Sequence, residues 1–182
     1  IAATKLLIVG LGSGDTVGIS QAAGAAGKAA RDAGANTVGL AMGNLDAAGT
    51  QTAVEAFTAG NYKFDKYKTG DGQKSPSSEL LLLNAASETG ISRGQAVAGG
   101  QALARDLVNE PGGSLTPVAF ARKASSVAKD AKLTAKILDA AAIKKARLGG
   151  LLGVNRGSDQ QPRFVELSYR PVGKARGHVA LV

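Results

Sequence analysis

Cysteine and tryptophan are absent from the sequence, and histidine occurs once, at His178. Without cysteine the chain forms no disulfide, has no thiol nucleophile and offers no thiolate to a metal ion. A single histidine cannot build a metal site without further ligands around it, and it gives no basis for a Ser-His-Asp triad. We therefore interpret His178 as a core or edge residue of the fold.

Long apolar runs are also missing. No stretch approaches the ~20 residues that cross a bilayer, and no signal-peptide pattern is found at the start of the sequence. We expect a cytoplasmic protein without a membrane partner. Aromatic residues make up 4% of the 182 residues, whereas glycine occurs 25 times, so the helices are expected to pack closely through alanine and glycine. The length allows one domain or two small ones.

Acidic residues are scarce in the second half of the chain. Residues 1–112 hold 9 Lys and Arg against 10 Asp and Glu, a net charge of −1, whereas residues 113–182 hold 13 against 4, a net charge of +9. Such an excess is typical of nucleic-acid-binding surfaces, but no aromatic residues alternate with these cations to stack on bases. We favour a solvated basic face and keep a nucleic-acid site as the alternative. Eight of these 13 cations are Arg122, Lys123, Lys129, Lys132, Lys136, Lys144, Lys145 and Arg147.

Apolar periodicity predicts strands and helices in alternation. In the first half, an apolar stripe at helical spacing stops at Gly34, and Val54 and Phe57 point inward from the next helix. We predict strands over 5–9, 37–42 and 79–84, helices over 15–33, 47–59 and 88–109, and a loop over 69–78. The first two strands are expected to pair in parallel through a right-handed crossover, and the fully apolar third strand is expected to be central.

The second half repeats this alternation with shorter elements. We predict helices over 117–130 and 140–148 and strands over 133–138, 163–169 and 178–182. The chain is thus expected to have an α/β fold. A mixed, largely parallel sheet with flanking helices is followed by a long linking helix and then by the first α/β elements of a second domain. Because both ends of the sequence fall in or near strands, we expect a piece of a longer chain.

A proline-and-glycine elbow separates the two halves. Pro111 lacks an N–H and disfavours helical geometry in Glu110, so the preceding helix should stop there. Gly112 and Gly113 allow a turn with positive φ. The pair that follows, threonine and Pro117, is typical of a helix N-cap followed by proline at the first helical position.

This elbow carries a resemblance to a known family. Its sequence, Asp-Leu-Val-Asn-Glu-Pro from Asp106 and Leu-Thr-Pro from Leu115, resembles the domain junction of the leucyl (cytosol) aminopeptidase family, which are metal-dependent exopeptidases. The resemblance extends over nearly the whole length, in segments 9–12, 62–68, 105–117, 150–158 and 180–182. It implies an N-terminal α/β domain over 1–90 that lacks its first strands, a linking helix and hinge over 91–112, and the beginning of the catalytic domain over 113–182.

The resemblance also implies a function for the parent enzyme. Members of the family use two divalent metal ions, zinc or manganese, to release N-terminal amino acids from peptides, and they assemble as hexamers. All the family's catalytic and metal-binding positions come after residue 182, so no catalytic, cofactor-binding or metal-binding residue is assigned here. The 182 residues are expected to be inactive alone and to serve assembly and active-site access. The remainder of the catalytic domain is the expected partner.

Two motifs allow a second interpretation. Gly10, Gly12 and Gly14 precede a helix and could cradle a phosphate, but the spacing is neither GxGxxG nor a P-loop, and Asp15 places a negative charge there. We favour a tight turn. Over Tyr62–Lys68, three rings alternate with lysines, which is compatible with a nucleic-acid-binding strip. We favour rings that pack on the domain edge while the lysines extend into solvent.

Two further features lie near the elbow and beyond it. Asp106 and Glu110 are four residues apart on one helix face, as in a paired-carboxylate site, but carboxylates at a helix C-terminus oppose its dipole. We favour an ion pair or hydrogen bond of Asp106 that fixes the hinge. The glycine-rich segment 149–158 is interpreted as close-packed backbone, with Arg156 as a contact to a neighbouring subunit.

Overall fold

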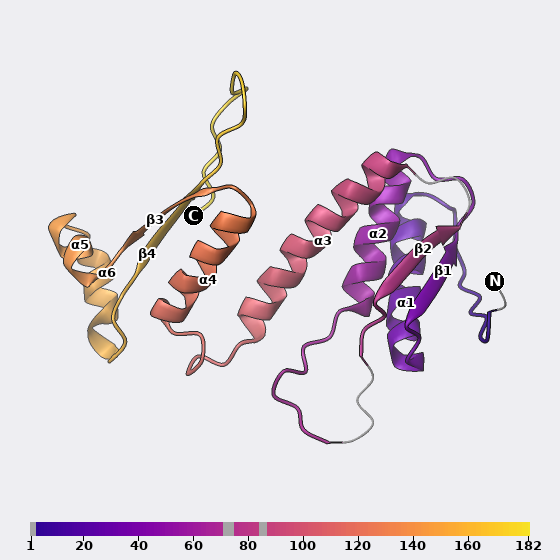
Figure 1. Ribbon diagram of the computed structural model, residues 1–182, viewed down its shortest axis with the longest axis horizontal. Helices are drawn as coiled ribbons and strands as arrows, with labels where there is room; N and C mark the ends of the chain where they lie inside the picture. The colour runs from indigo at the N-terminus through magenta and orange to yellow at the C-terminus, as the bar shows by residue number, and fades with distance from the viewer. Residues whose placement is uncertain (1–2, 71–74, 84–86) are drawn as a thin grey trace. The chain divides into compact units, whose positions relative to one another are not determined.

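The computed structural model describes residues 3–70, 75–83 and 87–182 (Figure 1). The chain divides into two compact units, with the boundary between Asn109 and Glu110. Among the described residues, the first unit contains three helices and a pair of strands, and the second contains one longer helix, two short ones, a 3₁₀ turn and another pair of strands. The α/β fold predicted from the sequence is confirmed.

Three helices form most of the first unit: α1 (Thr16–Ala33), α2 (Ala47–Asn61) and α3 (Glu88–Asn109). Aspartates cap the first two, since the Asp15 side chain accepts a hydrogen bond from the N–H of Gly18 and the Asp46 side chain accepts one from the N–H of Gly49. Gly34 ends α1 in the left-handed region, with φ 68°. Helix α2 packs against both α1 and α3 (Figure 1).

The core of this unit is built from small residues and one ring. Ala23 and Ala53 are fully buried, Phe57 is 3% exposed, and apolar side chains from the strand region, including Val38 and Leu80, pack against them. Glycine lets the helix backbones approach closely, because a Cβ at Gly27 would collide with the carbonyl of Phe57. The prediction of close packing through alanine and glycine is therefore confirmed for α1 and α2.

Two parallel strands complete the unit: β1 (Thr37–Ala41) and β2 (Glu79–Leu83), which pair from Thr37 with Glu79 to Ala41 with Leu83. Their positions match the predicted strands, although Asn84 lies outside the described residues, as do residues 71–74 of the predicted loop. In the described part of the chain, β2 pairs with β1 alone, so the prediction that it is central is wrong.

The predicted strand over 5–9 is also wrong. Leu6 and Ile8 are each 86% exposed, and no strand pairing involves this segment among the described residues. The expected crossover from 5–9 to β1 is therefore not formed. An apolar run marks a segment that gains by burial, but a strand also requires a neighbouring strand with which its N–H and C=O groups can bond.

The second unit begins with α4 (Pro117–Asp130) and continues through β3 (Thr134–Leu138), α5 (Ala140–Lys145), α6 (Gly149–Val154), the 3₁₀ turn η1 (Asn155–Gly157) and β4 (Phe164–Ser168). Strands β3 and β4 are antiparallel, and Lys136 faces Glu166 across them, with their charged atoms 3.7 Å apart. Largely parallel pairing thus describes the first unit but not the second.

Two expectations for the second unit are corrected. Residues 178–182 form no strand and are exposed, and His178 among them is neither a core residue nor part of a strand edge. In the segment 149–158, residues 149–157 are helical. The backbone there is not close-packed, because a Cβ added at Gly149, Gly150 or Gly153 would meet no atom within 4 Å. Glycine content alone does not distinguish a tight backbone contact from an exposed helix.

The elbow has the predicted boundaries. Helix α3 ends at Asn109, and the Thr116 side chain caps α4 by accepting a hydrogen bond from the N–H of Ala119 at 3.3 Å. Between them, the N–H of Ser114 donates to the Pro111 carbonyl at 2.8 Å, which closes a turn. Neither glycine of this turn has a positive φ, so that detail of the prediction is wrong. A turn of this kind is open to most residues.

Candidate functional site

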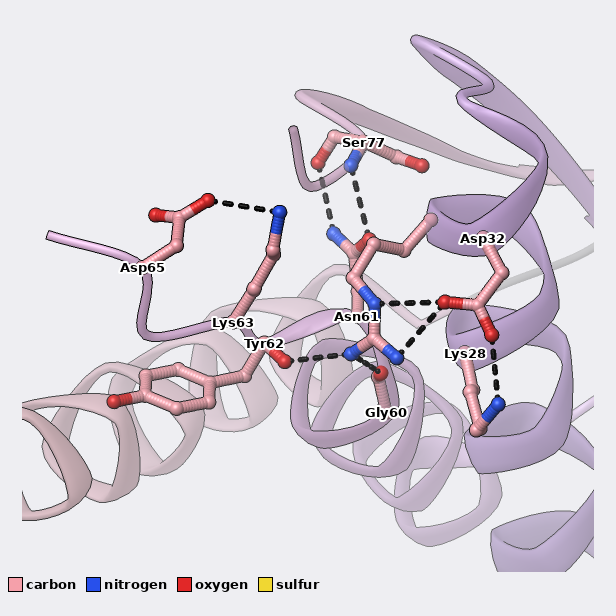
Figure 2. Close-up of polar contacts among 9 residues, drawn as sticks. Lys28, Asp32, Gly60, Asn61, Tyr62, Lys63, Asp65 and Ser77 are labelled. Atoms are coloured by element: carbon pink, nitrogen blue, oxygen red, sulfur yellow. Dashed lines mark hydrogen bonds and ion pairs between the residues drawn. The ribbon is translucent and has the colours of Figure 1, made fainter. Parts of the chain in front are cut away.

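The carboxyl end of α2 is the point at which the first unit concentrates its polar side chains (Figure 2). Side chains from α1 and α3 bond to residues 59–62 there, and so does the backbone of the segment before β2. We call this group the α2-end cluster. Its members are Arg31, Ala59, Gly60, Asn61, Tyr62, Ser77, Arg105, Asp106 and Asn109.

Arg31 of α1 holds the end of α2 from one side. Its Nη1 donates to the carbonyls of Gly60 at 3.0 Å and Tyr62 at 2.7 Å, which satisfies backbone acceptors at the helix end. Its Nε and Nη2 donate to Asp32, which also pairs with Lys28 at 2.6 Å. The bonds from Lys28 and then from Arg31 hold the pKa of Asp32 below its usual range.

Asn61 fastens the segment that leads into β2. Its Nδ2 donates to the Ser77 carbonyl and its Oδ1 accepts from the Ser77 N–H, each at 2.9 Å (Figure 2). The Asn61 side chain is buried at 8% exposure, so the two bonds replace those that water would make. Residues 75–77 are thereby tied to the end of α2, sixteen residues earlier in the chain.

Tyr62 connects the same point to the end of α3. Its hydroxyl donates to Oδ1 of Asp106 at 2.8 Å and accepts from Nδ2 of Asn109 at 3.2 Å. The Arg105 guanidinium lies over the Tyr62 ring, 3.8 Å from its centre, and donates to the Ala59 carbonyl at 2.8 Å. Asp106 therefore makes the hydrogen bond that the sequence predicted, and its partner is a tyrosine 44 residues away.

The surroundings of Tyr62 give a spectroscopic prediction. Partial removal of the phenol from water, together with its hydrogen bond to Asp106 and that group's charge, raises the pKa of Tyr62, against opposing effects of Asn109 and Arg105. A raised pKa means that this group's contribution to stability is complete below about pH 10 and is lost as the pH rises through the folded-state value. In an ultraviolet titration of phenolate, we expect a late component that belongs to Tyr62.

The late ionisation should disappear in Tyr62→Phe and persist in Tyr67→Phe, because Tyr67 is 50% exposed and serves as the matched control. Simultaneous ionisation of all three tyrosines would contradict the described environment of Tyr62.

The strip over Tyr62–Lys68 divides into two parts. Tyr62 belongs to the α2-end cluster, and Arg105 lies over its ring. Phe64 and Tyr67 contact each other with their centres 6.1 Å apart. Lys63 pairs with Asp65 at 2.9 Å, and the hydrogen bond in this pair holds the pKa of Asp65 below its usual range. These contacts agree with rings that pack on the domain edge and give the nucleic-acid interpretation no support.

The glycines before α1 form a tight turn, as predicted. Gly12 and Gly14 have φ values of 60° and 72°, and the N–H of Gly14 donates to the Leu11 carbonyl at 3.1 Å. The Asp15 carboxylate occupies the helix N-terminus, where its bond from the Gly18 N–H lowers its pKa. The chain's own carboxylate thus takes the position that a phosphate would need.

The described residues do not fit a two-metal centre. Among them, no group of three or more His, Cys, Asp or Glu side chains could hold a metal ion. Asp106 is engaged with Tyr62, and His178 is exposed. In the same described part of the chain, no helix has the length and hydropathy needed to cross a membrane.

Sequence reasoning missed several members of the α2-end cluster. Arg31, Asn61 and Ser77 stood out in no motif, since each looks like an ordinary polar residue of a helix or loop. A weak signal existed for Asn61, because asparagine after an apolar helical stripe is common where a polar side chain must satisfy nearby backbone.

Comparison with known proteins shows to which protein family this chain is similar. Residues 1–71 match the family model of the cytosol aminopeptidase family, N-terminal domain, and residues 102–182 match that of the same family's catalytic domain. The chain belongs to the cytosol aminopeptidase family. Both domain matches occur in one chain, and the α2-end cluster joins residues of the first match to the beginning of the second.

Curated relatives in this family support the assignment. A probable cytosol aminopeptidase of Rhodococcus erythropolis is 36% identical over all of this chain, and one of Aquifex aeolicus is 37% identical over 73% of it. The chain spans 37% and 27% of the lengths of these two relatives.

Solved structures show the same fold. Bottromycin maturation enzyme BotP aligns with a TM-score of 0.76 and 33% identity, covering 88% of this chain and 35% of that one. BotP in complex with Mn gives 0.75 and 32%, over 89% and 35% of the two chains. A mutant of tomato leucine aminopeptidase gives 0.75 and 25%, over 92% and 36%.

Proposed function

We propose that this chain supplies the N-terminal domain, the linking helix and the beginning of the catalytic domain of a two-metal aminopeptidase. In this proposal, residues 1–90 form the N-terminal domain, 91–112 the linking helix and hinge, and 113–182 the start of the catalytic domain. The observation that carries it is the match of both family domains, in order, to one chain. Peptides with a free N-terminus are the substrates of the complete enzyme.

The metal centre belongs, in this proposal, to family sequence that the 182 residues do not cover. Two divalent ions, zinc or manganese, would polarise the peptide carbonyl and supply the attacking hydroxide when bound there. The solved relative in complex with Mn supports manganese as one of these ions. The described residues of this chain hold no suitable ligand group, so no catalytic step is assigned to them. Their proposed roles are assembly into a hexamer and control of active-site access in the cytoplasm.

A chimera tests the proposal. The segment of the Rhodococcus erythropolis relative that aligns with this chain is replaced by residues 1–182, and release of leucine from a leucyl peptide is measured with added Mn²⁺. We expect the chimera to be active and hexameric by sedimentation, and the 182-residue chain alone to show neither turnover nor tight Mn²⁺ binding. The unaltered relative serves as the positive control.

Peptidase turnover by the 182-residue chain alone would refute the assignment of the metal ligands to other family sequence. A hexameric chimera that binds Mn²⁺ but releases no leucine would refute the proposed role of this segment.

A further inference from the structure

We propose that Tyr62, Arg105, Asp106 and Asn109 form a lock that holds the last turn of α3. We call these four residues the Tyr62 lock. All of them lie within the first unit. The inference goes beyond the proposed function and does not depend on it.

The first argument is that Tyr62 is itself firmly placed. Its N–H donates to the Thr58 carbonyl at 3.0 Å, and its carbonyl accepts from Arg31 at 2.7 Å. Helices α1 and α2 therefore both hold its backbone. Figure 2 shows the Tyr62 side chain extending away from the bonds to Arg31, so that the ring projects from this anchored point.

The second argument is that the hydroxyl of Tyr62 is used in both directions. A phenol offers one donor and accepts through its oxygen. Here the Tyr62 hydroxyl donates to the Asp106 carboxylate and accepts from the Asn109 amide. Asp106 and Asn109 are three positions apart on α3. Arg105 adds a cation–π contact to the same ring and a bond to the Ala59 carbonyl. Three side chains from one turn thus converge on one anchored residue.

The third argument concerns what this turn would do without the lock. The last turn of a helix leaves carbonyls unsatisfied and tends to fray. Pro111 follows the helix end after one intervening residue and has no N–H to donate. The last turn of α3 contains no basic residue that would favour the helix dipole. The charge of Asp106 opposes that dipole. The bond from Tyr62 offsets that unfavourable charge, because the carboxylate gains a donor.

The consequence is a defined end for α3. With the lock closed, the helix continues to Asn109, and the elbow starts at the next residue. With the lock open, the last turn would fray, and α3 would end before Asn109. Tyr62 is therefore a positioning residue for the elbow rather than a residue that touches substrate.

Amide hydrogen exchange on the 182-residue chain tests the lock. In Tyr62→Phe the ring stays over Arg105 while the hydroxyl is lost. We expect amides 107–109 to exchange about five- to tenfold faster, the effect of losing about one net hydrogen bond, while amides 98–101 in the middle of α3 are unchanged. The matched control, Tyr67→Phe, should change neither set.

Substitution at the acceptor separates a specific contact from general destabilisation. Asp106→Ala should accelerate exchange as Tyr62→Phe does, and Asp106→Asn should do so less, because its amide oxygen still accepts the bond. The double variant Tyr62→Phe with Asp106→Ala should be no faster than either single variant. An equal acceleration along all of α3, or fully additive effects, would overturn the proposal.

Discussion

Replacing Gly27 by alanine should destabilise the first unit, whereas the same replacement at Gly24, one turn earlier in α1, should stabilise it. A Cβ at position 27 would collide with the Phe57 carbonyl and approach the N–H nitrogen of Asn61 to 3.0 Å. These are backbone atoms of α2, so relief requires the two helices to separate. A Cβ at position 24 would meet the Ala56 carbonyl at 3.6 Å, an ordinary contact.

The two effects differ in sign because helix propensity and packing oppose each other at one site only. Alanine is favoured over glycine in a helix interior by about 1 kcal/mol, which is the gain expected for Gly24→Ala. At position 27 the same gain is outweighed by overpacking, and we expect a net loss of about 2–3 kcal/mol. Urea unfolding followed by far-ultraviolet circular dichroism measures both, and a shift of both midpoints in the same direction would contradict this packing.

Gly60 gives an independent check of the same interface. A Cβ there would collide with the Gly24 carbonyl, so α2 approaches α1 closely at this second point. The close contacts between α1 and α2 at Gly27 and Gly60 therefore lie toward the end of α2, where the α2-end cluster also lies. Close backbone approach brings Arg31 of α1 within reach of the Gly60 carbonyl.

Helix limits were the part of the fold that the sequence predicted best. The range predicted for α3 agrees with the structure at both ends, and α4 begins at Pro117 after a Thr116 cap. These limits depend on local chemistry, such as a side-chain acceptor at an N-cap or a proline that cannot continue a helix. A single sequence contains that information in neighbouring residues.

Strand predictions were correct only where a partner strand exists. In the apolar segments 37–42 and 79–84, residues 37–41 and 79–83 form β1 and β2 because they pair with each other. The segments 5–9 and 178–182 are equally apolar and form no strand in the described chain. Pairing is a property of two distant segments, and apolar composition describes only one of them.

The α2-end cluster shows the same limit for side chains. The sequence predicted a hydrogen bond or ion pair for Asp106, because a carboxylate at a helix C-terminus requires compensation. It did not indicate Tyr62 as the donor, since 44 residues separate the two. The pair of hydrogen bonds between Asn61 and Ser77 depends in the same way on where α2 ends relative to β2.

Replacing Phe57 by alanine should have the largest effect of any single substitution considered, and it should be confined to the first unit. The ring is 3% exposed and packs in a cluster that includes Ile19, Ala23 and Ala53. Removing a buried ring loses its transfer free energy and leaves a cavity, which together amount to about 3–5 kcal/mol. Alanine neighbours are short and cannot fill the space, so we expect little relaxation.

Phe120→Ala in α4 is the matched control, since this ring is 41% exposed and belongs to the second unit. Its loss should amount to less than about 1 kcal/mol. Because the chain divides at residue 109, protection of amides in α1 and α2 should fall in Phe57→Ala while protection in α4 is retained. Equal loss of protection in both units would mean that they unfold as one cooperative body, and that the ring at position 57 stabilises the whole chain.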